Sequence, residues 1–156
     1  MNNKERIIGL VKSVNRQGID QVIDYLNTSD YFTRGCYEHH TEPGGLAQHA
    51  LEVYDAMCRH AGSLPPESLV VAALFHDLGK TKPGDGHGHG QRSIAILEGC
   101  GFALTDDERD AITNHHDKVT AGVSILGSFL CEPNLLGLLS TSDMKSTGRW
   151  KEEHSN

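Results

Sequence analysis

Histidine and aspartate side chains are the residues of this chain with the clearest capacity for chemistry. The chain has 10 histidines among 156 residues, and His76 is followed directly by Asp77. Imidazole nitrogen and carboxylate oxygen together suit a divalent transition ion better than Mg or Ca, which prefer shells of oxygen. The same two side chains could instead cap a helix end and pair with a nearby charge. Taken alone, the pair leaves both interpretations open.

A strongly apolar segment precedes this pair. Residues 69–75 are apolar on every side of a helix, which predicts a buried helix from Pro66 to Leu78. Proline suits the first turn of such a helix, and Gly79 would provide its C-terminal stop. Ionisable groups at the end of a buried helix are costly unless they are paired or coordinated. Their position therefore favours a functional site.

Four further potential ligands lie in or beside other predicted elements. They are His49, His89, His115 and Asp143. Because each belongs to a different element, a helical bundle can bring them to one pocket, as di-metal bundle proteins do. Asp143 could equally pair with a nearby cation.

Neighbouring histidines compete for some of these roles. His87 lies two residues before His89 in a glycine-rich segment, and His116 directly follows His115. The residues themselves leave both choices open. A family resemblance carried by the flanking residues favours His89 and His115, with His87 and His116 as weaker candidates. His49 shares its predicted helix with apolar residues and could also be a core histidine.

The remaining pattern predicts helices and no strand. Apolar spacing indicates two short helices between Lys4 and Asn27, broken near Gly18, and further helices over 46–60, 91–98, 105–116 and 133–146. The helix over 105–116 begins with a capping box. Segment 28–44 should be a long ordered loop of the kind that usually carries function, and the glycine-rich segment 82–90 should be irregular. We therefore expect an all-α fold around a single core.

Composition narrows the class of partner. The formal charge of −7 argues against broad electrostatic binding to nucleic acid or to an anionic membrane, so we expect a small-molecule partner. The sequence has no membrane-spanning stretch and no apolar signal-peptide core, which predicts a cytoplasmic protein. The four cysteines are scattered without a Cys-x-x-Cys pair, and we expect them to be reduced. Oligomeric state stays open.

The order of these residues resembles the HD-domain superfamily of metal-dependent phosphohydrolases. The family pattern H…HD…D is matched by His49, by His76 with Asp77, and by Asp143. The surrounding sequences match too, with GGLAQH at 44–49, FHDLGK at 75–80 and SD at 142–143. This resemblance implies one all-α HD-domain bundle over 1–156, with a metal site at its centre. Its N-terminal helices would occupy 1–28 and its HD core about 30–146.

A finer resemblance concerns the number of metal ions. The paired histidines at 39–40 and the sequence GHGQRS at 88–93 resemble the HD segment of bacterial 3′ to 5′ exoribonucleases and related uncharacterised hydrolases, an HDIGK-like subgroup. This implies that His89 and His115 bind a second ion, with Asp77 bridging the two. Members with only H…HD…D hold one ion, so one or two ions remain open. Fe or Mn is the expected metal, with Zn, Ni and Co as alternatives.

The family resemblance also implies a reaction. A metal-activated water would attack the phosphorus of a phosphate ester, with His76, Asp77 and Lys80 at the catalytic centre. Lys80 would hold a phosphate oxygen, although it could instead be a cation favoured at a helix C-terminus. Further candidates for substrate contact are Arg92, His40, Lys118 and Lys145.

The sequence departs from several relatives in ways that bear on the substrate. It lacks the Gly-Tyr-Pro that follows the histidine pair in cyclic-di-GMP phosphodiesterases, and the Glu-rich motif of small 5′-deoxynucleotidases. It also lacks the N-terminal nucleic-acid-binding domain of the exoribonucleases, so we do not expect stable binding of nucleic acid. We expect a small nucleotide or another phosphate ester as substrate. Two alternatives remain: a mixed-valent di-iron oxygenase with a similar ligand set, and a non-catalytic nucleotide-binding regulatory module.

Overall fold

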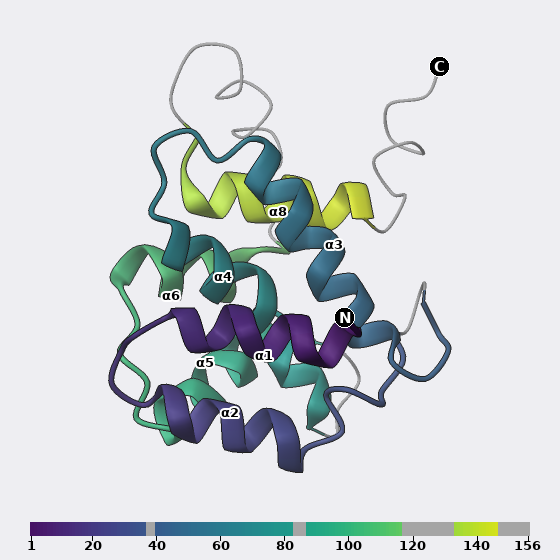
Figure 1. Cartoon of the computed structure of the whole chain (residues 1–156). Helices are drawn as coiled ribbons and strands as arrows, with labels where there is room; N and C mark the ends of the chain where they lie inside the picture. The colour runs from purple at the N-terminus through teal and green to yellow at the C-terminus, as the bar shows by residue number, and fades with distance from the viewer. Residues whose placement is uncertain (37–39, 83–86, 117–132, 147–156) are drawn as a thin grey trace.

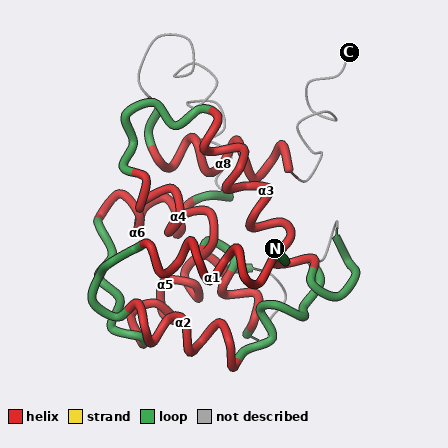
Figure 2. The backbone as a smooth tube through the Cα atoms, viewed as in Figure 1, coloured by secondary structure: helices red, strands yellow, loops and turns green. Residues whose placement is uncertain are grey.

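Every regular element is helical in the computed structural model of the chain, which describes residues 1–36, 40–82, 87–116 and 133–146 (Figures 1 and 2). The elements are α1 (Asn3–Ser13), α2 (Ile19–Thr28), α3 (Gly45–Arg59), α4 (Pro66–Phe75), the 3-10 helix η1 (Leu78–Thr81), α5 (His89–Gly99), α6 (Asp106–Asn114) and α8 (Leu135–Ser146). No strand occurs in these ranges, which confirms the predicted all-α class.

Helix α4 lies at the centre of the bundle. It contacts α1, α3, α6 and α8, and α8 in turn packs against α3 and α6 (Figure 1). Residues 68–75 are all buried, as the apolar sequence predicts. The C-terminal end of α4 therefore lies inside the bundle, where side chains from neighbouring helices can join it in one site. No described helix has the length and apolar character that crossing a membrane requires.

The end of α4 differs from the prediction. The helix stops at Phe75, so His76 and Asp77 lie in the turn between α4 and η1. Gly79 is not the helix stop but lies inside η1, where an added Cβ atom would be 2.1 Å from the backbone oxygen of His89. The missing side chain lets η1 pack directly on α5. The requirement for glycine is thus a tertiary contact rather than a helix cap.

The start of α5 also differs from the prediction. The segment 82–90 was expected to be irregular, but α5 begins at His89 and so includes its last two residues. Gly88 precedes the helix with a φ of 70°, a left-handed conformation that glycine adopts easily. His89 therefore sits on the first turn of a helix instead of in a loop.

A buried ion pair holds the start of α6. The predicted capping box is confirmed, because Thr105 and Glu108 each accept a hydrogen bond from the other's backbone N–H. Glu108 is fully buried and accepts from both Arg16 terminal nitrogens at 2.7 Å and from Ser68 Oγ at 2.8 Å. Burial alone would raise the pKa of Glu108, but these hydrogen bonds and the Arg16 charge hold it below its ordinary value. The pair joins α6 to the α1–α2 connection and to α4.

Among the described residues, the buried apolar side chains form two clusters rather than the single core expected. The larger cluster lies among α1 to α6, and the smaller one among α3, α4, α6 and α8, with Tyr54 packed against both. In α8, Leu135, Leu138 and Leu139 are buried, whereas Leu136 is only partly buried.

The described cysteines are free thiols. They are Cys36, Cys58 and Cys100, and Cys131 lies outside the described residues.

Candidate metal centre

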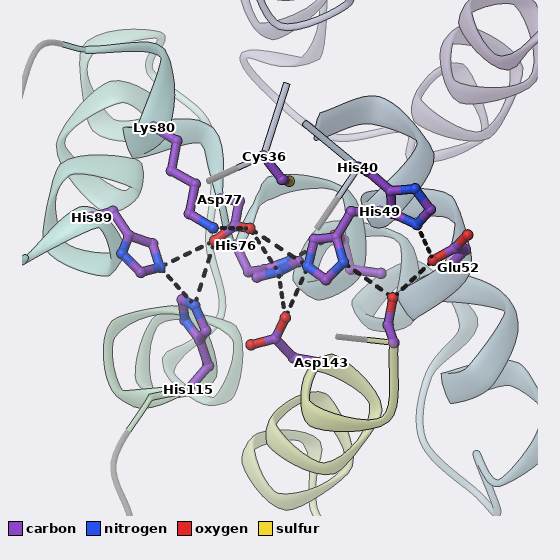
Figure 3. Close-up of polar contacts among 12 residues, drawn as sticks. Cys36, His40, His49, Glu52, His76, Asp77, Lys80, His89, His115 and Asp143 are labelled. Carbon is purple, nitrogen blue, oxygen red and sulfur yellow. Dashed lines mark hydrogen bonds and ion pairs between the residues drawn. The ribbon is translucent and has the colours of Figure 1, made fainter. Parts of the chain in front are cut away.

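The six preferred ligands converge in one buried cluster (Figure 3). They are His49 from α3, His76 and Asp77 from the turn after α4, His89 from α5, His115 at the end of α6, and Asp143 from α8. Each of these residues is at most 7% exposed. The structure thus brings together side chains from five segments of the chain, and their binding of metal remains a prediction.

Asp77 lies between two sets of histidines. Its Oδ2 atom is 3.6 Å from His49 Nε2 and 3.4 Å from His76 Nε2. Its Oδ1 atom is 3.0 Å from His89 Nε2 and 3.6 Å from His115 Nε2. The two oxygens of one carboxylate therefore face different imidazoles, as a bridging ligand would.

We divide the six residues into two donor groups according to the oxygen of Asp77 that their histidines face. The first donor group consists of His49, His76, Asp77 and Asp143. The second donor group consists of Asp77, His89 and His115. Within the first group, Asp143 Oδ1 lies 2.8 Å from His49 Nε2 and 3.6 Å from His76 Nε2. In the second group, His89 Nε2 and His115 Nε2 are 3.0 Å apart.

Some polar atoms of the cluster are buried without a hydrogen bond in the part of the chain that the structure describes. Among the described residues, neither His76 Nε2 nor Asp77 Oδ1 makes one with suitable geometry. Buried polar atoms normally have a partner, so such atoms call for an explanation. Both are aimed into the cluster beside other nitrogen and oxygen donors, and a divalent transition ion would satisfy them. The residues present therefore fit a metal ion of this class.

Backbone carbonyls orient two of the imidazoles. Nδ1 of His76 lies 2.8 Å from the oxygen of Ala73, and Nδ1 of His115 lies 2.6 Å from the oxygen of Ile112. A carbonyl can only accept, so each Nδ1 carries a proton, and Nε2 is the atom left to act as a ligand. Both rings are held in the tautomer that metal binding requires.

The cluster stabilises positive charge beside its two carboxylates. Burial would lower the pKa of His76, but Asp77 and Asp143 raise it to about 10. Burial would likewise raise the pKa of Asp77, yet the charges of His76 and Lys80 hold it well below its ordinary value. A proton on His76 therefore balances part of the negative charge of Asp77 and Asp143. A metal ion could balance the same charge in its place, because metal ions and protons compete for the same donor atoms.

Lys80 reaches the rim of the cluster. Its ammonium nitrogen is 2.9 Å from Asp77 Oδ2, on the side of the first donor group. Burial would lower the pKa of Lys80, but the charge of Asp77 raises it above its ordinary value, so the ammonium stays charged. Since α4 ends at Phe75, Lys80 does not lie in its last turn. The contact with Asp77 therefore explains the position of Lys80 better than attraction to the C-terminal end of that helix does.

The two competing histidines take different positions. His87 is exposed, and its backbone oxygen accepts a hydrogen bond from Arg92, so the structure brings His89 and not His87 into the cluster. His116 is 42% exposed and lies at the edge, with Nε2 3.9 Å from Asp143 Oδ2. Its donor atom nevertheless lies within 4.8 Å of those of the second donor group. His116 is thus an additional candidate ligand beside His115.

The other candidates for substrate contact lie elsewhere or are not described. Arg92 donates to the backbone oxygens of Gly79 and His87, which fixes its guanidinium on the chain and not on the cluster. His40 contacts Glu52 instead of the donor groups. Lys118 and the side chain of Lys145 lie outside the described residues.

Sequence reasoning gave no role to several polar residues around the cluster, although Ser93 belongs to the GHGQRS motif. Ser93 accepts a hydrogen bond from the Gly79 N–H at 2.8 Å, and its hydroxyl lies 2.9 Å from the backbone oxygens of both His76 and His89. It ties the turn after α4 to α5. Glu52 and Ser146, which meet beside His49, were also missed. A glutamate three residues after a candidate ligand on one helix was the available signal.

Comparison with known proteins identifies one family. The family model of the HD domain matches residues 46–149, about two thirds of the chain. This segment contains all six clustered residues. No curated protein and no solved structure matches the chain.

Proposed function

The chain belongs to the HD domain family, and on that basis we propose that it is a metal-dependent phosphohydrolase or phosphodiesterase acting on a small phosphate ester, with a nucleotide as the expected substrate. The observation that supports this most is the division of Asp77 between two buried donor groups. The exoribonuclease-like subgroup remains a prediction.

The two donor groups suggest two ions. The first group would hold one ion through His49, His76, Asp77 and Asp143, and the second group would hold another through Asp77, His89 and His115. Ions held by these residues would supply a water molecule of lowered pKa for attack on phosphorus and positive charge beside the phosphoryl oxygens. The mixture of imidazole and carboxylate donors supports a transition metal, with Fe or Mn expected.

The protein's own part is to fix the donors and to keep charge near the phosphate. The hydrogen bonds of His76 and His115 to backbone oxygens preset their ligating atoms, so that little reorganisation is needed on binding. Burial of the cluster strengthens its electrostatic interactions relative to water. Lys80, whose ammonium lies 2.9 Å from Asp77 Oδ2 at the rim of the cluster, would offer its charge to a phosphate oxygen of a bound substrate.

Metal analysis followed by an activity panel tests the proposal. Protein purified without chelator should contain about two ions per chain and hydrolyse phosphomonoesters or phosphodiesters, including nucleotides, with Mn(II) or Fe(II). Chelation should abolish the activity, and added Mn(II) should restore it. Absence of bound metal would contradict the proposal. Oxygen consumption by the iron form without phosphoester hydrolysis would favour the oxygenase alternative, and nucleotide binding without turnover would favour a regulatory module.

Replacing Lys80 by alanine is expected to reduce kcat/KM about 10- to 100-fold while leaving the metal content unchanged. The reason is the loss of one charge-assisted hydrogen bond to the phosphate, of about 1.5–3 kcal/mol. Steady-state kinetics and metal analysis on the same preparation measure both quantities. Lys82→Ala is the control, because Lys82 is exposed and lies over the Tyr25 ring. Loss of metal in the Lys80 variant would mean that this lysine maintains Asp77 instead.

A further inference from the structure

We propose that Glu52 is a positioning residue that sets the tautomer of His49 through the hydroxyl of Ser146. The inference deepens the proposed function and rests on it, because it takes His49 Nε2 as a metal ligand. Glu52 lies one turn after His49 on α3, and Ser146 is the last residue of α8.

The contacts form a continuous chain. His49 Nδ1 lies 3.1 Å from Ser146 Oγ, and Ser146 donates to Glu52 Oε2 at 3.0 Å. The same oxygen lies 2.9 Å from His40 Nε2, and Glu52 Oε1 accepts from Gln48 Nε2 at 3.1 Å. Figure 3 shows this path running from His49 to Glu52 and His40, on the side of His49 away from His89.

His49 differs from His76 and His115 in the partner of its Nδ1 atom. Those two rings face backbone oxygens, which can only accept a hydrogen bond. His49 faces a hydroxyl, which can either donate or accept and therefore does not by itself select a tautomer. Nε2 of His49 faces the Asp143 carboxylate at 2.8 Å, which favours a proton on that nitrogen, so metal binding at Nε2 requires a group on the other side of the ring that favours the proton on Nδ1.

Glu52 is the group that favours a proton on Nδ1 of His49. An ionised carboxylate can only accept, so the single hydroxyl proton of Ser146 points to Glu52. Ser146 is then left to accept from the Nδ1–H of His49, and Nε2 is the ligating atom toward Asp77 and Asp143. Hydrogen-bond partners on the far nitrogen of a metal-bound histidine fix its tautomer and its orientation in this way.

The surroundings of Glu52 keep it ionised. Burial would raise the pKa of Glu52, but the hydrogen bonds from Gln48, His40 and Ser146 outweigh it and lower that pKa. These donors also use both carboxylate oxygens, which fixes the plane of the group. Glu52 is therefore held as an acceptor in the direction of Ser146.

The loop before α3 is shaped to bring His40 to this carboxylate. His40 has a φ of 48°, in the left-handed region that non-glycine residues rarely adopt. Its backbone oxygen lies so close to Gly45 that a Cβ there would be 1.6 Å away. Gly44, with a φ of 87°, provides the turn into the helix. The turn at Gly44 and the close approach at Gly45 thus explain why both residues are glycine. Together they allow His40 to lie beside Glu52, the residue proposed to act on His49.

Calorimetric titration with Zn(II) against a competing chelator tests the inference without any substrate. In Glu52→Gln the amide can donate to Ser146 and reverse the chain, so we expect the affinity of the first donor group to fall about 10- to 100-fold. The affinity of the second donor group and the unfolding midpoint of metal-free protein should stay unchanged. The Zn(II)-loaded wild type should also show a slowly exchanging Nδ1–H signal of His49 by NMR, and this signal should be lost in the variant.

Two further variants separate this role from a general structural one. Ser146→Ala should weaken the same donor group, and the double variant should be no worse than Ser146→Ala alone, because Glu52 acts through that hydroxyl. Glu42→Gln is the matched control, since Glu42 also approaches His40, at 3.4 Å, but is exposed. Unchanged Zn(II) affinity in Glu52→Gln and Ser146→Ala, with the wild type binding normally, would overturn the inference. Failure of the wild type to bind metal would contradict the proposed function itself.

Discussion

Asp77→Asn is expected to remove bound metal and to lower kcat/KM by at least about 10³-fold. Asp77 is the one residue shared by both donor groups, and an asparagine can offer only a neutral oxygen to one side. A bound ion contributes several kcal/mol of transition-state stabilisation, and each 1.4 kcal/mol corresponds to about a factor of ten. Metal content and phosphoester kinetics of the variant measure the effect.

The controls for this prediction use the same chemistry elsewhere. Asp55→Asn removes a partly exposed carboxylate that pairs with Arg6, and it should leave metal content and activity unchanged. His89→Ala removes a ligand of the second donor group alone and should leave about one ion per chain. Full activity of Asp77→Asn, or two ions in His89→Ala, would show that the metal site has been placed wrongly.

Arg16→Ala is expected to lower the free energy of unfolding by about 3 kcal/mol. The substitution leaves the carboxylate of Glu108 fully buried without its cation, and breaking a buried pair on one side typically costs about 3–5 kcal/mol. Since Glu108 also caps α6, the helix that carries His115 at its end should loosen as well. Urea denaturation followed by circular dichroism gives the difference from the wild type.

The pH dependence of this effect has a definite sign. The pKa of Glu108 is lowered in the folded protein, so its contribution to stability is present above the ordinary value of 4.5 and is lost as the pH falls through the folded value. The difference between wild type and Arg16→Ala should therefore shrink in acid. Arg109→Ala is the control, because Arg109 pairs with Glu98 at an exposed site and should cost less than about 1 kcal/mol. A difference as small as that of the control would contradict the prediction.

Local sequence patterns predict the helices well and their ends less well. The buried character of α4 follows from its apolar residues, and the start of α6 follows from its capping box. The end of α4 and the start of α5 depend on the close packing of η1 on α5, which Gly79 permits. Such a contact between segments leaves no periodic signal in the sequence. The first turn of α5 likewise depends on this packing, so the glycine-rich sequence before it gave no sign of a helix.

The candidate site shows the same division. Residue types and their order single out the six clustered side chains, but they do not indicate which oxygen of Asp77 faces which histidine. The choice between His87 and His89 depends on burial, which the start of α5 determines. The supporting roles of Ser93 and Glu52 arise from contacts made only in the folded chain. Sequence thus predicts the chemistry of the donors, and tertiary packing decides their arrangement.

The division of the cluster among helices has a consequence for folding order. His49 and Asp143 are far apart in the sequence, so the first donor group needs α3 and α8 docked together. The second donor group draws on the turn after α4, on α5 and on the end of α6, which are closer together in the sequence. Contacts across a long sequence separation carry a larger loop-closure cost than shorter ones. The two donor groups should therefore form at different stages of folding. The first donor group should form last, and it should be lost first when α8 detaches.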